Sequence, residues 1–135
     1  MALRKPLPEV RFTMRGVPKS YSNQRVHWAV QAADKKAWKE QTWFMGQSAR
    51  VLAGWIMADA RFKDRRAVTI TLYRTRLLDT DNAYSSIKAI LDGLKQQLIV
   101  DDSPQWCELS VEQVKVAHKP EERVEVVVTE IGENT

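Results

Sequence analysis

Four aspartates and a lysine around one short helical segment are the residues of this chain whose types and spacing suggest chemistry. Asp79 and Asp81 lie one residue apart before the segment, Lys88 lies within it, and Asp101 and Asp102 follow it. Mg²⁺ and Mn²⁺ prefer oxygen ligands, and two or three converging carboxylates hold such an ion. The ion activates water and neutralises charge on a phosphodiester, and a nearby lysine stabilises the same charge. The stretch therefore predicts a divalent-metal site that acts on phosphate.

The residues between these acidic groups have the spacing of one amphipathic helix. Apolar side chains recur at steps of three and four residues, namely Tyr84, Ile87, Leu91, Leu94 and Leu98. A polar stripe on another side consists of Asp81, Ser85, Lys88 and Asp92. Because helical side chains lean toward the N-terminus, we expect the Lys88 ammonium to reach back toward Asp79 and Asp81. We also expect those two aspartates to be extended and to point to one side, and the sheet to bring Asp102 round to them.

Each part of this stretch also has a plain structural explanation. The sequence DTDN at 79–82 is a common turn and N-cap composition. The sequence DDSP at 101–104 is a common turn composition. Lys88 and Asp92 have the spacing of an ordinary surface ion pair on a helix. The occurrence of all three around one helix favours the metal site over separate structural roles.

The rest of the chain predicts a small sheet and one further helix. Strands are indicated by alternating or β-branched apolar residues at 10–15, 68–73, 109–116 and 124–131. The last of these is the most apolar, so we expect it to be central, and a change of parity in the third predicts a bulge near Glu112 and Gln113. The expected fold class is α/β (α+β), with a small mixed β-sheet and two main helices in the order β-α-β-α-β-β. We expect a single domain over residues 1–135.

The first of the two helices is predicted at about 31–53, which has no proline. Its expected buried stripe consists of Ala33, Ala37, Trp38, Phe44 and Val51. Lys35, Lys36 and Lys39 then cluster on the remaining surface of the helix. The tryptophans at 28, 38, 43 and 55 either pack in the core or a dimer contact, or stack on bases.

Positive charge is concentrated in the first half of the chain. Residues 1–66 carry 14 Lys or Arg against 5 Asp or Glu, whereas residues 67–135 carry 7 against 12. A basic half beside an acidic half suits a protein that holds a polyanion with one side and cations with the other. The alternative is an ordinary solvated basic face. The basic residues that we expect to contact a polyanion are Arg15, Lys19, Lys35, Arg74 and Arg76.

Cysteine and hydropathy patterns bear on the compartment. Cys107 is the only cysteine, so no intrachain disulfide forms, and a buried thiol is the expected state. The N-terminus has no apolar leader, and the longest apolar run, at 51–58, is too short to cross a membrane. We therefore expect a cytoplasmic protein with no membrane partner. His27 has no ligand partner at metal spacing, so we expect a structural role for it.

The motifs of the acidic stretch resemble those of a known enzyme family. The pattern D-x-D-N, then S-x-K-x-x-x-D-G-L, then V-D-D-S-P resembles the RusA family of Holliday-junction resolvases, which occur in phages and prophages. The resemblance is closest over residues 74–116. Some members have the lysine four residues after the second aspartate, whereas here Lys88 is seven residues after Asp81. Some members have arginine before the first aspartate, where this chain has Leu78.

The resemblance implies a function and a set of roles. It implies a homodimeric, Mg²⁺-dependent endonuclease of DNA recombination and repair that nicks two opposing strands of a four-way junction symmetrically, with Mn²⁺ as an alternative ion. Asp79, Asp81 and Asp102 match the metal-binding aspartates, Lys88 matches the catalytic lysine, and Asn82 matches a position that contacts DNA. Two alternatives stay open: a protein that binds branched DNA with a silent site, and a metal-dependent nuclease that acts on flaps or splayed arms.

Overall fold

The structure is a computed structural model that describes residues 8–20, 27–55, 65–95 and 97–131. Four strands form one mixed sheet in the order β1-β4-β2-β3. These strands are β1 (Glu9–Arg15), β2 (Arg66–Arg74), β3 (Cys107–Lys115) and β4 (Arg123–Glu130). β4 pairs antiparallel with both β1 and β2, whereas β2 and β3 are parallel. The prediction that the last strand is central is therefore confirmed.

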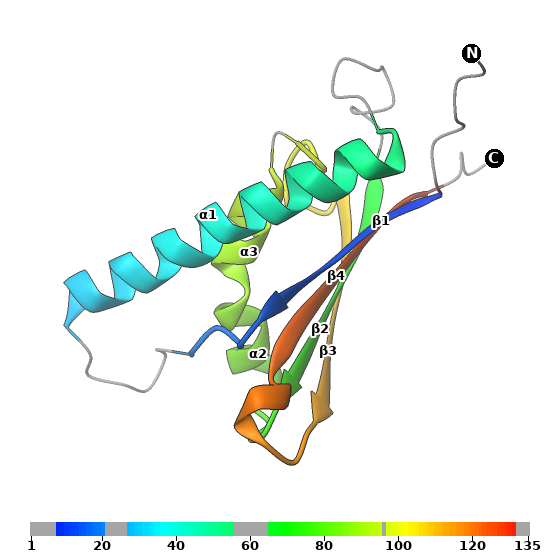
Figure 1. The fold of residues 1–135 in the computed structure, drawn as a ribbon. Helices are drawn as coiled ribbons and strands as arrows, with labels where there is room; N and C mark the ends of the chain where they lie inside the picture. Colours follow the sequence, from blue (N-terminus) through cyan, green and yellow to red (C-terminus); the bar gives the residue numbers. More distant parts are fainter. Residues whose placement is uncertain (1–7, 21–26, 56–64, 96, 132–135) are drawn as a thin grey trace.

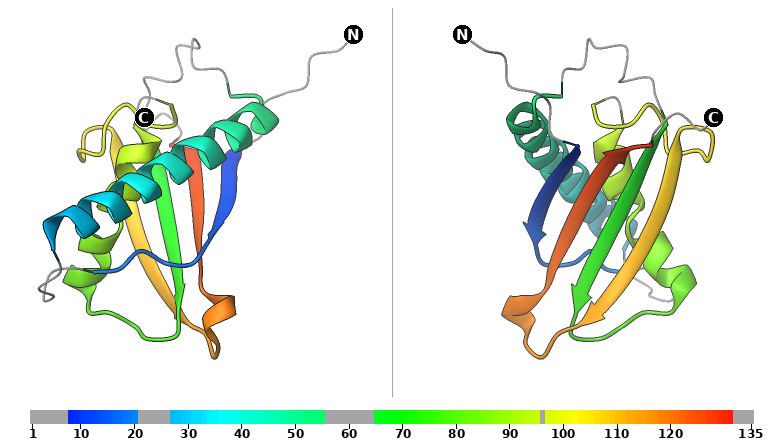
Figure 2. Two further views of the ribbon diagram at one scale, coloured as in Figure 1. Left: turned by 60° about the vertical axis from the view of Figure 1, so that its left-hand side comes forward. Right: turned by 90° about the vertical axis from the view of Figure 1, so that its right-hand side faces the viewer.

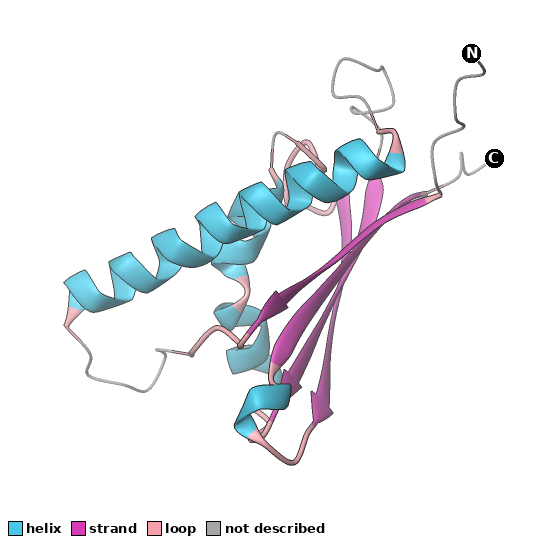
Figure 3. Ribbon diagram, in the orientation of Figure 1, coloured by secondary structure: helices cyan, strands magenta, loops and turns pink. Residues whose placement is uncertain are grey.

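The described helices all lie on one face of this sheet (Figures 1 and 2). They are α1 (Trp28–Ala53), α2 (Thr80–Ser86) and α3 (Lys88–Leu94), and a short 3-10 turn, η2 (Lys119–Glu121), joins β3 to β4 (Figure 3). The mixed α+β class is confirmed. The second predicted helix is two helices rather than one, because Ile87 (φ −99°, ψ 7°) leaves helical geometry between them.

One apolar core fills the space between the helices and the sheet. The sheet contributes alternate residues, Val10, Phe12, Met14, Val68, Ile70, Leu72, Val124, Val126 and Val128. Helices α2 and α3 and the residues that join and follow them contribute Ile87, Ile90, Leu91, Leu94 and Leu98. Burial is thus confirmed for four of the five predicted apolar positions, since Tyr84 is exposed. The predicted helix itself ends earlier than expected, because α3 stops at Leu94 and Leu98 follows it. The polar stripe at 81, 85, 88 and 92 is exposed, as expected.

The buried face of α1 differs from the predicted stripe. The helix buries Thr42, Gly46 and Ala53, whereas Phe44 and Val51 are more than half exposed. Small side chains are needed because α1 crosses α3 closely. A Cβ on Gly93 of α3 would lie 2.6 Å from the Lys39 carbonyl oxygen and 2.6 Å from the Thr42 Cβ. Hydrophobic spacing does not detect a contact that depends on small residues.

The ends of α1 follow ordinary capping rules. The His27 side chain caps the first turn by accepting a hydrogen bond from the Ala29 N–H, at 3.2 Å, so the helix begins three residues earlier than predicted. Gly54 ends the helix in the left-handed conformation (φ 77°), which glycine adopts without a steric penalty. The structural role expected for His27 is confirmed. None of the described helices is long and apolar enough to cross a membrane.

β3 runs without the predicted bulge. Its pairing with β2 is regular from Arg66 opposite Cys107 to Arg74 opposite Lys115. The sequence misleads here because a polar residue, Gln113, follows Leu109 and Val111 on the core face, as its pairing with Leu72 shows. Burial raises the pKa of the Cys107 thiol, at the start of this strand, to about 11.

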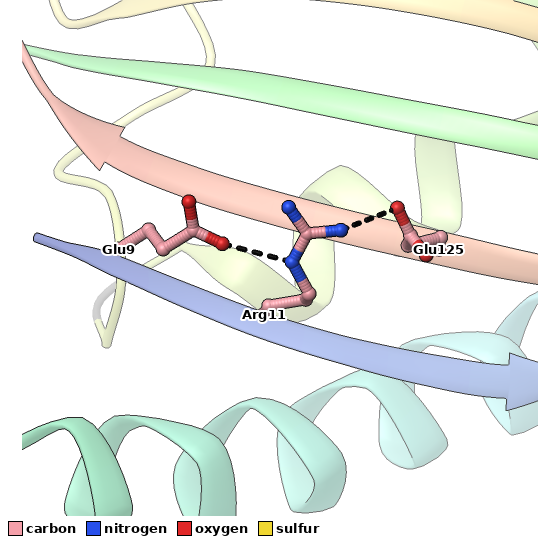
Figure 4. Close-up of polar contacts among 3 residues, drawn as sticks. All are labelled: Glu9, Arg11 and Glu125. Carbon is pink, nitrogen blue, oxygen red and sulfur yellow. Dashed lines mark hydrogen bonds and ion pairs between the residues drawn. The ribbon is translucent and has the colours of Figure 1, made fainter. Parts of the chain in front are cut away.

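The second face of the sheet is not covered by any described helix (Figure 2). On this face Arg11 of β1 forms ion pairs with Glu9, at 2.8 Å from its Nε, and with Glu125 of β4, at 2.8 Å from its Nη1 (Figure 4). One carboxylate of its own strand and one of β4 therefore neutralise Arg11 locally. Arg15 lies on the same face of β1, opposite Arg123, and is exposed.

Candidate nucleic-acid interface

The start of α2 carries the first two predicted metal ligands. Asp79 is the N-cap residue: its Oδ1 accepts the Asn82 backbone N–H at 2.8 Å, and its Oδ2 accepts from the Asn82 side-chain amide at 3.1 Å. Asp81 is exposed in the first turn of the helix. The expectation of two extended aspartates is confirmed for Asp79 (φ −67°, ψ 166°) and wrong for Asp81, because the helix begins at Thr80. Asp79 is thus hydrogen-bonded to Asn82, and Asp81 is open to solvent.

Asp102 lies with a different group of charges. The Lys95 ammonium is 3.4 Å from Asp102, 3.7 Å from Asp101 and 3.2 Å from Asp92. Hydrogen bonding to Asp92 raises the pKa of Lys95, and the Asp102 charge acts in the same direction. Asp92 pairs with Lys95, so the alternative of a Lys88–Asp92 surface pair is not observed, and three aspartates surround one lysine instead.

The topology explains why Asp102 does not meet Asp79 and Asp81 within one chain. Since β2 and β3 are parallel, the chain leaves β2 after Arg74 at one end of the sheet and enters β3 at Cys107 at the other end. Eight residue steps at about 3.3 Å separate these ends by roughly 26 Å. The expectation that the sheet brings the three aspartates together is not met in the single chain.

The donor set at the start of α2 suits part of a magnesium site. Over the described residues, no three His, Cys, Asp or Glu side chains form a group that could hold a metal ion. Mg²⁺, however, is commonly bound by one or two carboxylates together with waters and substrate phosphates. Asp79 and Asp81 provide two such carboxylates at an exposed helix start. These two residues fit a metal shared with a phosphate, whereas Asp102 does not belong to the same group.

A basic cleft of about 630 Å³ lies between the first half of α1, the segment that follows β1 and the junction of α2 with α3. We call it the lysine cleft, after five lining residues: Lys19, Lys35, Lys36, Lys39 and Lys88. Asp34 and Asp92 also line it, so five lysines against two aspartates give a formal net charge of +3. Three of the predicted site residues, Lys19, Lys35 and Lys88, are thus brought together although they are far apart in the sequence.

Arg74 is beneath this cleft rather than on its surface. It is 6% exposed, and its Nη2 donates to the Pro18 carbonyl at 2.7 Å and to the Ser86 Oγ at 3.1 Å. Both partners line the lysine cleft. Burial lowers the pKa of Arg74. The predicted direct contact of Arg74 with DNA does not agree with this burial, since the guanidinium holds two walls of the cleft together.

The remaining predicted DNA contacts are scattered. Arg76 is exposed in the turn after β2, and Arg15 lies on the uncovered face of the sheet. Asn82 is half-buried and bonded to Asp79. The loop between β1 and α1 is described only as far as Ser20, and residues 21–26 lie outside the described residues.

Trp38, expected in the buried stripe of the first helix, packs partly against the core and lines the lysine cleft, and Trp55 is buried. Sequence reasoning missed two residues of this region, Lys95 and Gln113. Lys95 was not singled out, although its position three residues after Asp92 is a recognisable helical pair spacing. Gln113 was assigned to a bulge, and a polar residue on the core parity of an apolar strand is the signal that could have identified it.

No family model matches the chain, and no curated protein matches it with significant similarity.

Proposed function

We propose that this protein is a metal-dependent endonuclease that acts on branched DNA, with the four-way junction as its substrate. The proposal rests on one observation: the consecutive helices α2 and α3 carry exposed carboxylates and form one wall of a cationic cleft. Asp81 lies in the first turn of α2, and Lys88 lies seven residues later in the wall of the lysine cleft. Only the non-helical residue Ile87 separates the end of α2 from Lys88, the first residue of α3. The motif resemblance to junction resolvases supports the same function.

The proposed roles follow from the chemistry of each group. Asp79 and Asp81 would hold Mg²⁺, which when bound supplies a Lewis acid and an activated water for phosphodiester hydrolysis. Asn82 orients Asp79 through the two hydrogen bonds described above. The Lys88 ammonium stabilises negative charge that grows on the phosphate oxygens. The other lysines of the cleft hold the strand, so binding weakens steeply with salt.

The proposal includes a homodimer. A four-way junction has approximate two-fold symmetry, and a C2 dimer presents one site to each of two strands. The resemblance implies that Asp102 also holds metal. Because β2 and β3 are parallel, a site that contains Asp79, Asp81 and Asp102 together requires Asp102 from the second subunit.

A second candidate is a protein that binds branched DNA without cutting it. The described residues include no group of three His, Cys, Asp or Glu side chains that could hold a metal ion, and this observation favours the second candidate. The lysine cleft serves both candidates equally, so DNA binding alone does not separate them.

The test compares a labelled four-way junction with a linear duplex of matched sequence, with Mg²⁺ or with EDTA. The wild-type protein should produce paired, symmetric nicks in the junction only, and only with Mg²⁺. Asp81→Asn should bind the junction and fail to nick it. Tight junction binding without nicks by the wild type would favour the second candidate. Equal cutting of both substrates would contradict junction selectivity.

A further inference from the structure

The lysine cleft has an excess of cations that the described residues do not neutralise. Of its five lysines, only Lys36 has an ion pair within the described ranges, with Glu40 at 3.9 Å. Asp92, one of the two lining carboxylates, is paired with Lys95. Like charges held in one concave wall repel each other, and an anion bound between them offsets this repulsion. The cleft therefore has the electrostatics of an anion site.

Arg74 provides a second and independent observation. Its guanidinium is buried under the cleft and remains charged at neutral pH. Over the part of the chain that the structure describes, it has no ion pair, and its buried Nε has no hydrogen-bond partner. Glu122 is the carboxylate whose charge opposes the effect of burial. A buried cation without a close counter-ion is costly, and an anion in the cleft above would offset part of that cost.

The shape of the cleft decides which form of nucleic acid fits. Concave sites of roughly 300–1,000 Å³ enclose ligands of about the size of a nucleotide. The lysine cleft falls in this range at about 630 Å³. Trp38 contributes an aromatic side chain to its wall, and bases of unpaired strands stack on such side chains. The bases of a duplex are already stacked on one another, so they cannot stack on Trp38.

We propose that the lysine cleft binds the phosphates of an unpaired DNA strand, one or two nucleotides at a time. The inference rests on the proposed function for its choice of DNA. It extends that function by assigning the cleft to the single-stranded segment that opens at a branch point. Lys35 and Lys39, one helical turn apart on α1, contact successive phosphates, and Trp38 between them contacts a base.

The test is a binding titration in EDTA, so that no cleavage intervenes. Labelled oligothymidylate and a blunt duplex of the same length are titrated at several salt concentrations by fluorescence anisotropy. The wild type should bind the single strand more tightly than the duplex. The double variant Lys35→Ala, Lys39→Ala should lose about tenfold or more in single-strand affinity. Its slope of log affinity against log salt should fall by about 1.4, at about 0.7 per lost contact.

Two controls make the outcome decisive. Lys119→Ala, on the turn between β3 and β4, should bind as the wild type does, and thermal unfolding should show that the cleft variants are folded. Tighter binding of the duplex, or equal losses for both DNA forms in the double variant, would overturn the inference. Because EDTA removes the metal, single-strand binding is measured whether or not the protein is a nuclease. Failure of the nuclease proposal is therefore distinguishable from failure of this one.

Discussion

The side-chain amide of Gln113 brackets the backbone of Leu78 with two hydrogen bonds. Its Oε1 accepts the Leu78 N–H at 3.0 Å, and its Nε2 donates to the Leu78 carbonyl at 2.7 Å. A side chain thereby mimics one step of strand pairing, at the residue directly before Asp79. Gln113 is on the core face of β3, where Leu109 and Val111 precede it. These two hydrogen bonds fix the entry of the chain to α2.

Replacement of Gln113 by leucine should release this segment. Gln113→Leu keeps a similar volume but leaves both backbone groups of Leu78 without their partner, so we expect a loss of about 1–3 kcal/mol in the free energy of unfolding. Amide hydrogen exchange at Leu78 should accelerate. Gln41→Leu, on the exposed face of α1, is the matched control. Unchanged exchange at Leu78 would show that the two bonds do not hold the segment.

Gly93 should not tolerate even one methyl group. Alanine favours a helix over glycine by about 1 kcal/mol, but a Cβ here would lie 2.6 Å from the Lys39 carbonyl oxygen. Because that atom belongs to the backbone, α1 and α3 must separate, and we expect Gly93→Ala to lose about 2 kcal/mol of stability in urea denaturation. Gly16→Ala provides the comparison, since a Cβ at Gly16 meets nothing within 4 Å. This variant therefore measures only the cost of the positive φ of +77°. Stabilisation by Gly93→Ala would contradict the close crossing.

The strands and the apolar spacing of the α2–α3 segment could be predicted because each depends on a local period. The alternation at Val10, Phe12 and Met14 indicates a strand with one buried face, and β1 buries these three residues. The position of Asp102 could not be predicted in this way. Whether β3 pairs parallel or antiparallel with β2 is decided by the whole sheet, and this direction separates Asp102 from Asp79.

The role of Glu122 could not be predicted from the sequence, because it depends on contacts with a residue far away along the chain. Glu122 accepts hydrogen bonds from both the backbone N–H and the hydroxyl of Thr75, each at 3.0 Å. These residues are far apart in the sequence.

The break between α2 and α3 could not be predicted either. Ile87 has the apolar spacing of a continuous helix, but its backbone is not helical.

Stability should depend on pH through Glu122. The hydrogen bond from the Thr75 backbone N–H, more than any other contact, lowers the pKa of this carboxyl from 4.5. A lowered folded-state pKa stabilises the fold above the unfolded-state pKa, and the contribution is lost as the pH falls through the folded value. Glu122→Gln should therefore cost about 1 kcal/mol at pH 7. Below pH 4.5 the difference from the wild type should shrink as the wild-type carboxyl becomes protonated.

The matched control for this pH series is Glu112→Gln, which removes an exposed carboxyl from β3. Urea denaturation at several pH values should show no pH-dependent difference between this variant and the wild type. A Glu122→Gln deficit that stays constant down to the acid limit would contradict the role of the charge.

The proposed dimer predicts complementation between two inactive variants. Asp81→Asn and Asp102→Asn should each abolish junction nicking. If each site takes Asp79 and Asp81 from one subunit and Asp102 from the other, mixed dimers contain one intact site. Unfolding and refolding the two variants together should then restore nicking of one strand. No activity in the mixture, with mixed dimers verified by mass, would exclude a shared site.

The central claim is that the α2 carboxylates and the lysine cleft act on the same DNA strand, and Lys88 is the residue that links them. The most direct test is the single-turnover nicking rate of a four-way junction by Lys88→Ala, with enzyme in excess and Mg²⁺ present. The rate should fall by about 100-fold, the loss expected when one donor to a developing oxyanion is removed. Junction binding in EDTA should weaken only as the loss of one phosphate contact requires. A nicking rate equal to that of the Lys119→Ala control would contradict the claim.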